Sequence, residues 1–103
     1  MKSVELHALA AQDITEIWEY IANDNVSAAQ RVREELTRAI HNLAAFPHRG
    51  HKRPDLTHRP LRFQIVREYL IAYVPDRKPL LVVAVMHGRR SPRVMAAILQ
   101  GRQ

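Results

Sequence analysis

The spacing of hydrophobic residues changes along the chain, and each spacing predicts a different element. Residues 2–6 alternate between polar and apolar positions, with Val4 and Leu6 on one side, which is typical of a short strand with one buried face. From about residue 9 the apolar positions recur every three or four residues, which predicts an amphipathic helix whose only polar N-cap candidate is His7. The stripe of this helix comprises Ala10, Ile14, Ile17, Trp18 and Ile21, so we expect Trp18 in the core.

A second helical stripe follows the interruption at residues 23–26. The sequence SAAQ at 27–30 has the form of a capping box, so Ser27 is expected to cap the helix while Gln30 reaches back. Phe46-Pro47 ends it, because proline disfavours helical geometry in the preceding residue. Two such helices joined by a short polar turn predict an antiparallel helical hairpin. The second stripe comprises Ala29, Val32, Leu36, Ile40 and Leu43.

The second half of the chain is dominated by strand-like runs. Residues 47–60 contain three prolines and three histidines, which indicates a loop. The runs 61–66, 69–74 and 80–86 follow with short turn-like breaks and predict an antiparallel meander. The run 80–86 is apolar throughout, so we place it in the middle of the sheet, covered on both faces.

The end of the chain predicts a short helix. Ser91 and Pro92 suit the N-cap and the first helical position, and Gly101 suits the end. Gly88 is expected to supply a positive φ where the last strand ends. The resulting order of strand, helix, helix, three strands and helix predicts an α+β fold, with the helical hairpin packed on a small, mostly antiparallel sheet. We expect one domain over residues 1–103.

Charge and composition narrow the classes of function. Residues 1–46 carry four Lys/Arg and seven Asp/Glu, a balance of −3, whereas residues 47–103 carry twelve and three, a balance of +9. The basic half favours an anionic partner, either a nucleic acid or an acidic protein. The absence of cysteine excludes disulfides and thiolate chemistry. No signal-like segment is present, and no apolar run approaches the roughly 20 residues that cross a bilayer, so we expect a cytoplasmic protein.

Six motifs, in order over residues 8–93, resemble the ParE branch of the RelE/ParE toxins of bacterial toxin–antitoxin systems. Each motif alone is weak, and the ordered set is specific to the superfamily. The motifs are DITEIWEYIA (13–22), SAAQRV (27–32), LAAFPHRG (43–50), RPDL (53–56), LRFQIVREYLIAY (61–73) and VMHGRR (85–90). Val26 is a departure, since many members have proline before the second helix.

The resemblance implies a toxin that binds DNA gyrase or topoisomerase IV and stabilises its cleaved-DNA complex. Such a toxin needs no cofactor and has no catalytic residues. It is neutralised by a co-expressed ParD-like antitoxin with an acidic, amphipathic segment, so we expect a hetero-oligomer with the antitoxin or a homodimer. Complementary charge on the basic half suits this partner. The residues expected to contact partners are Arg59, Arg62, Arg67, Arg89, Arg90, Arg93, Val94, Met95, Ile98 and Leu99.

The sister branch supplies an alternative, because RelE-type toxins cleave mRNA on the ribosome. That chemistry needs cations and an acid or base, which Arg62, His87, Arg89 and Arg90 would supply. No tyrosine follows residue 73, although many nuclease members carry one near the C-terminus. A third class, a bare nucleic-acid-binding module, predicts salt-sensitive DNA binding without toxicity.

Several of these residues also have a purely structural interpretation. His87, at the end of a buried strand, suits capping or stacking on a neighbour. Tyr69 and Tyr73 share one face of a strand and are expected to pack against the helices rather than stack on bases. The apolar stripe of the last helix either packs on its own sheet, which we favour, or meets a partner. His48, His51 and His58 share a loop, but we expect no metal site there.

Overall fold

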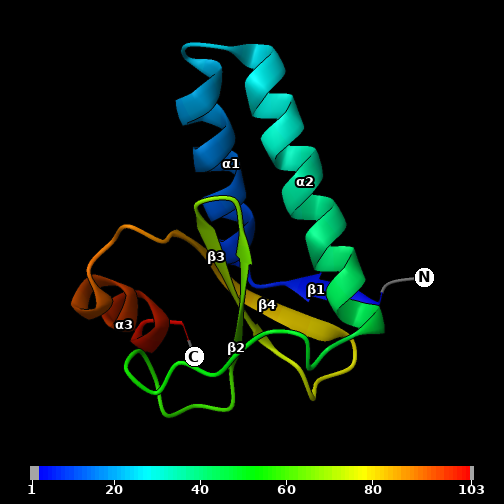
Figure 1. The fold of residues 1–103 in the computed structure, drawn as a ribbon, viewed down its shortest axis with the longest axis vertical. Helices are drawn as coiled ribbons and strands as arrows, with labels where there is room; N and C mark the ends of the chain where they lie inside the picture. The colour runs from blue at the N-terminus through cyan, green and yellow to red at the C-terminus, as the bar shows by residue number, and fades with distance from the viewer. Residues whose placement is uncertain (1–2, 103) are drawn as a thin grey trace.

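The computed structural model describes residues 3–102 and confirms the expected order of elements (Figure 1). The helical hairpin covers one face of the sheet, and the last helix lies against the other. The elements are β1 (Val4–Leu6), α1 (Ala8–Ala22), α2 (Val26–Ala45), β2 (Arg62–Val66), β3 (Tyr69–Val74), β4 (Leu80–His87) and α3 (Pro92–Gln100). None of the helices within residues 3–102 is long and apolar enough to span a membrane.

The four strands form one mixed sheet in the order β1-β4-β3-β2. The expected antiparallel meander of β2, β3 and β4 is confirmed, and β1 adds to β4 in parallel. The register shifts where Ala72 pairs with Ala84 but Tyr73 pairs with Val82, which leaves Val83 as an extra residue in β4. The apolar strand β4 therefore lies inside the sheet, as its composition predicts.

Both faces of the central strands are buried. On the helical-hairpin side, α2 residues such as Leu36 and Leu43 pack with Ile71, Tyr73 and Val82 of the sheet. On the other face, α3 and the loop before β2 cover the sheet. This second cluster includes Leu56, Leu61, Phe63, Met86, Met95 and Leu99. Burial on both faces explains why the sequence of β4 shows no polar alternation.

The helix starts agree with the sequence prediction at two of three places. The His7 Nδ1 accepts a hydrogen bond from the Leu9 N–H at 3.0 Å and caps α1. Ser91 caps α3 through its Oγ, which accepts from the Val94 N–H at 3.2 Å, and Pro92 takes the first helical position. The capping box expected at Ser27 is wrong, because α2 begins one residue earlier, at Val26. Its cap is Asn25, which has an extended backbone and accepts from the Ala28 N–H at 3.0 Å.

Two further expectations are corrected. Trp18 is half-buried beside the core rather than inside it, because its indole Nε1 donates to Gln30 Oε1 at 3.0 Å near the surface. Gly88 does not have a positive φ; among the described residues the positive φ belongs to Arg67, at 55° in the β2–β3 turn. Glycine suits position 88 for a different reason, since an added Cβ would lie 3.2 Å from the Glu68 carbonyl oxygen.

Candidate functional site

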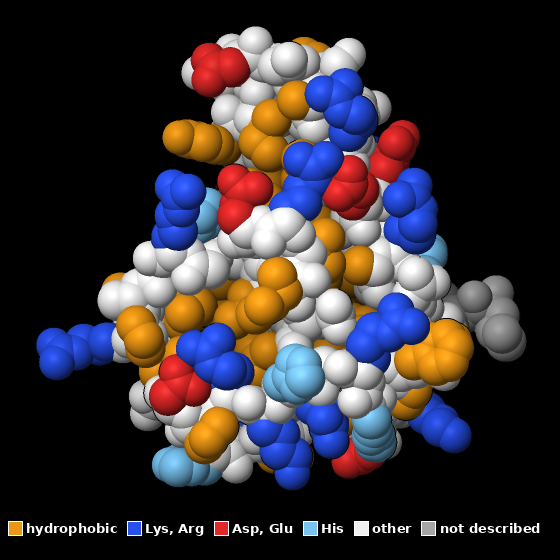
Figure 2. Space-filling model, in the orientation of Figure 1, with side chains coloured by type: hydrophobic (Ala, Val, Ile, Leu, Met, Phe, Trp, Pro, Cys, Tyr) orange, Lys and Arg blue, Asp and Glu red, His pale blue; other side chains and the backbone are white. Residues whose placement is uncertain are grey.

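A groove of about 630 Å³ runs between α1, the start of α2 and the end of the sheet where β4 leaves it. We call it the α1–β4 groove. Hydrophobic side chains gather below the helical hairpin on the face shown in Figure 2, bordered by charged side chains of both signs. The apolar lining includes Ile17, Ile21, Val32, Tyr69 and Val85, and the polar lining includes Asp13, Glu16, Arg67, Glu68, His87, Arg89 and Arg90. Four residues named from the sequence as candidates, Arg67, His87, Arg89 and Arg90, thus meet in one groove.

Arg67 lines the groove, and its side chain is paired with a carboxylate of the same chain. Its Nε donates to Glu35 Oε1 at 2.7 Å and its Nη2 to Glu35 Oε2 at 2.6 Å. This pair joins the β2–β3 turn to α2. The hydrogen bonds from Arg67 hold the pKa of the Glu35 carboxyl below its ordinary value. A partner that recruited Arg67 would have to compete with this carboxylate.

His87 is held in place by its neighbours, and its structural interpretation is confirmed. Its ring meets the Tyr69 ring edge-on, with centroids 5.5 Å apart and an interplanar angle of 77°. Its Nδ1 accepts a hydrogen bond from the Arg89 N–H at 3.1 Å, which leaves the proton of the neutral ring on Nε2. That Nε2 lies 3.9 Å from a Glu68 carboxylate oxygen. His87 therefore shapes the exit of β4 and fixes the backbone from which the following arginines extend.

Three arginines project from this exit. Arg89, Arg90 and Arg93 are exposed, and within residues 3–102 their side chains form no hydrogen bond or ion pair. The loop backbone is ordered, because the Arg90 N–H donates to the His87 carbonyl at 3.1 Å. Free guanidinium groups on an ordered loop suit the recognition of a carboxylate or a phosphate.

The remaining two arginines of the sequence prediction are used inside the fold. Arg59 Nη1 donates to the Leu99 carbonyl at 2.8 Å and ties the long loop to α3. Arg62 Nη1 donates to the Gly50 carbonyl at 2.7 Å. Both side chains are half-buried. Arg59 and Arg62 therefore stabilise the loop before β2, and neither lines the α1–β4 groove.

The four residues considered for RNA cleavage are not assembled. Arg62 lies opposite Tyr73 on β3, whereas His87 lies opposite Tyr69 at the other end of that strand. Four residues of strand separate the two positions by roughly 13 Å. His87, Arg89 and Arg90 come together without Arg62, so the structure separates the cations that this chemistry would combine.

The two tyrosines pack inside, as expected. Both are buried, and burial raises the pKa of each phenol. The Tyr73 hydroxyl donates to the Pro47 carbonyl at 2.8 Å and accepts from the Gly50 N–H at 2.9 Å. Tyr73 thus fixes the loop that follows α2 and is closed to a stacking base.

The apolar stripe of α3 packs mainly on its own sheet. Met95 and Leu99 are 3% and 1% exposed, so their side chains are taken up by packing within the fold. Val94 is 44% exposed and Ile98 is half-buried. The apolar surface that α3 offers to a partner is therefore Val94 with part of Ile98.

Sequence reasoning missed Asp13 and Arg102, which form an ion pair with the Arg102 Nη2 2.9 Å from the Asp13 Oδ1. The two residues are 89 positions apart, and no spacing rule links them. Asp13 has one sequence signal, since it is a carboxylate close to the apolar stripe of α1. Its side chain also lines the α1–β4 groove.

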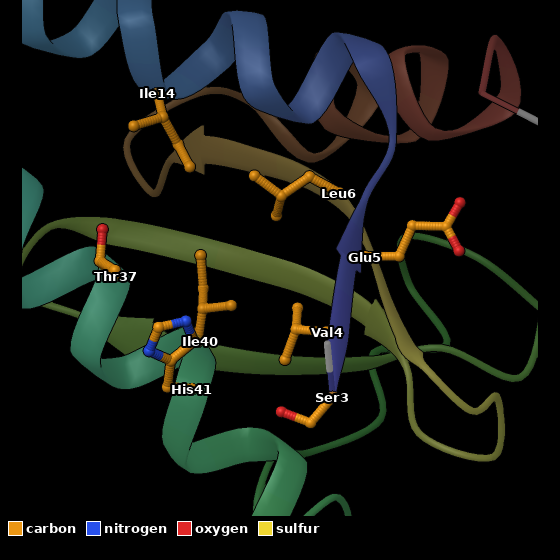
Figure 3. A pocket seen from close by; sticks show the side chains of 8 residues that line it. All are labelled: Ser3, Val4, Glu5, Leu6, Ile14, Thr37, Ile40 and His41. Carbon is orange, nitrogen blue, oxygen red and sulfur yellow. The ribbon is translucent and has the colours of Figure 1, made fainter. Parts of the chain in front are cut away.

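A second hollow, of about 480 Å³, lies between β1, α1 and α2 (Figure 3). Val4, Leu6, Ile14 and Ile40 point into it, whereas Glu5 points away and pairs with Arg77 at 3.1 Å. Among residues 3–102, no arginine or lysine lines this hollow. Within residues 3–102, no group of three His, Asp or Glu side chains is placed to hold a metal ion. Of the arginines named from the sequence, Arg89 and Arg90 line the α1–β4 groove without an internal partner, and Arg93 follows them at the start of α3.

Comparison with protein families matches residues 4–92 to the ParE toxin of type II toxin-antitoxin system, parDE. The matched segment runs from β1 to the first residue of α3 and includes the whole β4 exit. No curated protein matches the chain in sequence. A type II toxin has an antitoxin as its partner, which agrees with the basic back half of the chain. The chain belongs to the family of ParE toxins of type II toxin–antitoxin systems.

Proposed function

We propose that this toxin binds bacterial DNA gyrase, or its relative topoisomerase IV, and stabilises the complex in which the DNA is cleaved. It acts by binding and has no catalytic residues of its own. Family membership supports the toxin class, and the site geometry supports the mode of action. The observation that carries the proposal is the division of the arginines. Arg89, Arg90 and Arg93 are free, whereas Arg62, on β2 opposite Tyr73, is bound to the Gly50 carbonyl.

This division favours binding over RNA cleavage for a chemical reason. Cleavage at a 2′-hydroxyl needs a base, an acid and several cations within contact distance of one phosphate. The β4 exit offers cations, but the Nδ1 of its one histidine already accepts a backbone N–H. Free arginines on an ordered loop need no such assembly to hold an acidic surface or a DNA backbone.

The antitoxin segment is proposed to lie in the α1–β4 groove. The apolar lining suits the apolar face of an amphipathic segment, and Arg89 and Arg90 suit its carboxylates. Arg93 and Val94 extend this surface onto the start of α3. A cytoplasmic location follows from the proposed target.

A gyrase cleavage assay tests the proposal. Supercoiled plasmid is incubated with purified gyrase, ATP and the toxin, and linear DNA is measured after detergent and protease treatment. We expect linear DNA with the wild type and with the control Arg33→Ala, which changes a free, exposed arginine of α2 that does not line the α1–β4 groove. The matched antitoxin should suppress the signal. Absence of linear DNA with gyrase and with topoisomerase IV would contradict the proposed target.

A further inference from the structure

Within residues 3–102, part of β4 has a neighbouring strand on one side only. The parallel partner β1 ends at Leu6, opposite Val82, and the chain then turns into α1. The strand β4 continues to His87, so from Val83 onward β3 covers one side only. An open strand edge presents N–H and C=O groups that can pair with another chain.

Two side chains from distant parts of the sequence occupy this edge. The Val85 N–H donates to Asp13 Oδ2 at 2.9 Å, and Arg102 Nη1 donates to the Val83 carbonyl at 3.1 Å. Asp13 and Arg102 also hold each other through two hydrogen bonds. Their side chains are only 15% and 11% exposed. The pair thus provides hydrogen-bond partners for the Val83 carbonyl and the Val85 N–H, just beyond the point where β1 ends. The pair is largely buried from water.

The other two edges of the sheet are protected in other ways. On the outer edge of β2, His51 exchanges two backbone hydrogen bonds with Phe63, at 2.9 and 2.8 Å, and the Gln64 side chain donates to the Ile65 carbonyl at 3.2 Å. The edge strand β1 is only three residues long, and short edge strands template pairing poorly. On the exposed part of β4, two side chains that also pair with each other satisfy the strand groups.

We propose that Asp13 and Arg102 form an edge latch, which prevents a second copy of this chain from pairing its own strand with β4. When the latch opens, the Val83 carbonyl and the Val85 N–H lose their partners. The α1–β4 groove already runs along this edge, since Val85 and His87 line it, so an incoming strand has room. In a pure sample the second strand comes from another copy. This inference does not rest on the proposed gyrase target.

Amide hydrogen exchange and sedimentation test the latch together. Arg102→Ala removes both the ion pair and the donor to Val83. We expect the Val85 amide to exchange about tenfold faster than in the wild type at low protein concentration. We also expect the average mass to rise with concentration more steeply than for the wild type. Arg33→Ala, which removes the same charge from an exposed arginine without an internal partner, should change neither.

Arg102→Lys keeps the charge but replaces the guanidinium, which can donate to Asp13 and Val83 together, with a single ammonium group that reaches fewer acceptors. The Val85 amide of this variant should exchange at a rate between those of the wild type and Arg102→Ala, and the variant should self-associate less than Arg102→Ala. If Arg102→Ala does not fold, Arg102→Lys compared with the wild type tests the latch. Unchanged exchange at Val85 in the folded variants would overturn the latch. Faster exchange without any gain in self-association would overturn its protective role.

Discussion

Arg67 and Glu35 join the tip of the β2–β3 hairpin to α2 through two parallel hydrogen bonds, at 2.7 and 2.6 Å. The hairpin tip reaches up beside the helices in Figure 1. Arg67 has a left-handed backbone in this turn, with φ at 55°, and its side chain reaches Glu35 on α2. The pair therefore holds the β2–β3 turn in place relative to α2, and both elements line the α1–β4 groove.

Glu35→Gln should weaken this link in a pH-dependent way. Arg67 lowers the pKa of Glu35 in the folded state, so the carboxylate contributes stability above its unfolded pKa. That contribution is lost as the pH falls through the folded pKa. We expect the variant to be less stable than the wild type at about pH 7, and the difference to shrink as the pH is lowered toward about 2. Urea unfolding at both pH values measures this; an equal difference at both would contradict the ion-pair explanation.

Tyr73→Phe should destabilise the fold by about 1–3 kcal/mol, because it removes a buried hydroxyl that serves both Pro47 and Gly50. The Gly50 N–H and the Pro47 carbonyl then lose a partner in a buried place. Tyr20→Phe is the matched control, since Tyr20 is 82% exposed and should change stability little. Urea unfolding compares the two, and equal effects would mean that the Tyr73 hydroxyl does not hold the loop.

Stability should also fall in alkali. Burial raises the pKa of Tyr73 above its unfolded value, so the neutral phenol contributes stability below the unfolded pKa. This stability is lost as the pH rises from about 10 through the folded pKa. The Tyr73→Phe variant should lose less stability between about pH 9 and pH 11 than the wild type. A variant with the same alkaline loss would show that other groups cause it.

Gly50→Ala should be costly, because the new Cβ would lie 2.7 Å from both the Phe63 carbonyl oxygen and the Tyr73 hydroxyl. One contact is backbone, so the strand or the loop must move, at about 1–3 kcal/mol. Gly101→Ala is the control, since its Cβ would meet ordinary contacts at 3.6 Å or more and its φ is −76°. Thermal unfolding of both variants measures the difference in stability. An unchanged unfolding temperature for Gly50→Ala would mean that the loop does not lie this close to Phe63 and Tyr73.

The three free arginines should govern antitoxin binding. Replacing Arg89, Arg90 and Arg93 together by Ala should slow association with the antitoxin, most strongly at low salt, and leave the fold intact. Arg62→Ala was expected from the sequence to act in the same way. The structure instead predicts a less stable loop, because Arg62 holds the Gly50 carbonyl. Stopped-flow measurement at two salt concentrations gives the rate of antitoxin association, and circular dichroism reports loss of the fold. An unchanged association rate for the triple variant would mean that these arginines do not contact the antitoxin.

Local sequence rules predict elements and faces here because the relevant contacts are close in sequence or periodic. The stripes of α1 and α2, the two-sided burial of β4 and the Ser91 cap all follow from such patterns. The sequence prediction for the start of α2 is wrong because Asn25 and Ser27 both have side chains that suit an N-cap. Which of the two caps the helix depends on the backbone of the turn.

Side-chain partners over long distances could not be predicted in this way. Arg59, Arg62 and Arg67 look as free in the sequence as Arg89, and only the fold brings them to Leu99, Gly50 and Glu35. The Asp13–Arg102 pair depends on β1 ending early, which leaves part of β4 uncovered. The basic half of the chain thus divides into arginines that hold the fold and arginines that are free for partners.

Induction of the toxin in bacteria, with DNA breaks and mRNA cleavage recorded in the same culture, distinguishes gyrase binding from RNA cleavage in one measurement. We expect DNA breaks and a DNA-damage response with intact mRNA, and the antitoxin should suppress both the breaks and the response. The same breaks should appear with Arg33→Ala. Ribosome-dependent mRNA cleavage without DNA breaks would contradict the proposed action on gyrase and favour the RelE-type activity.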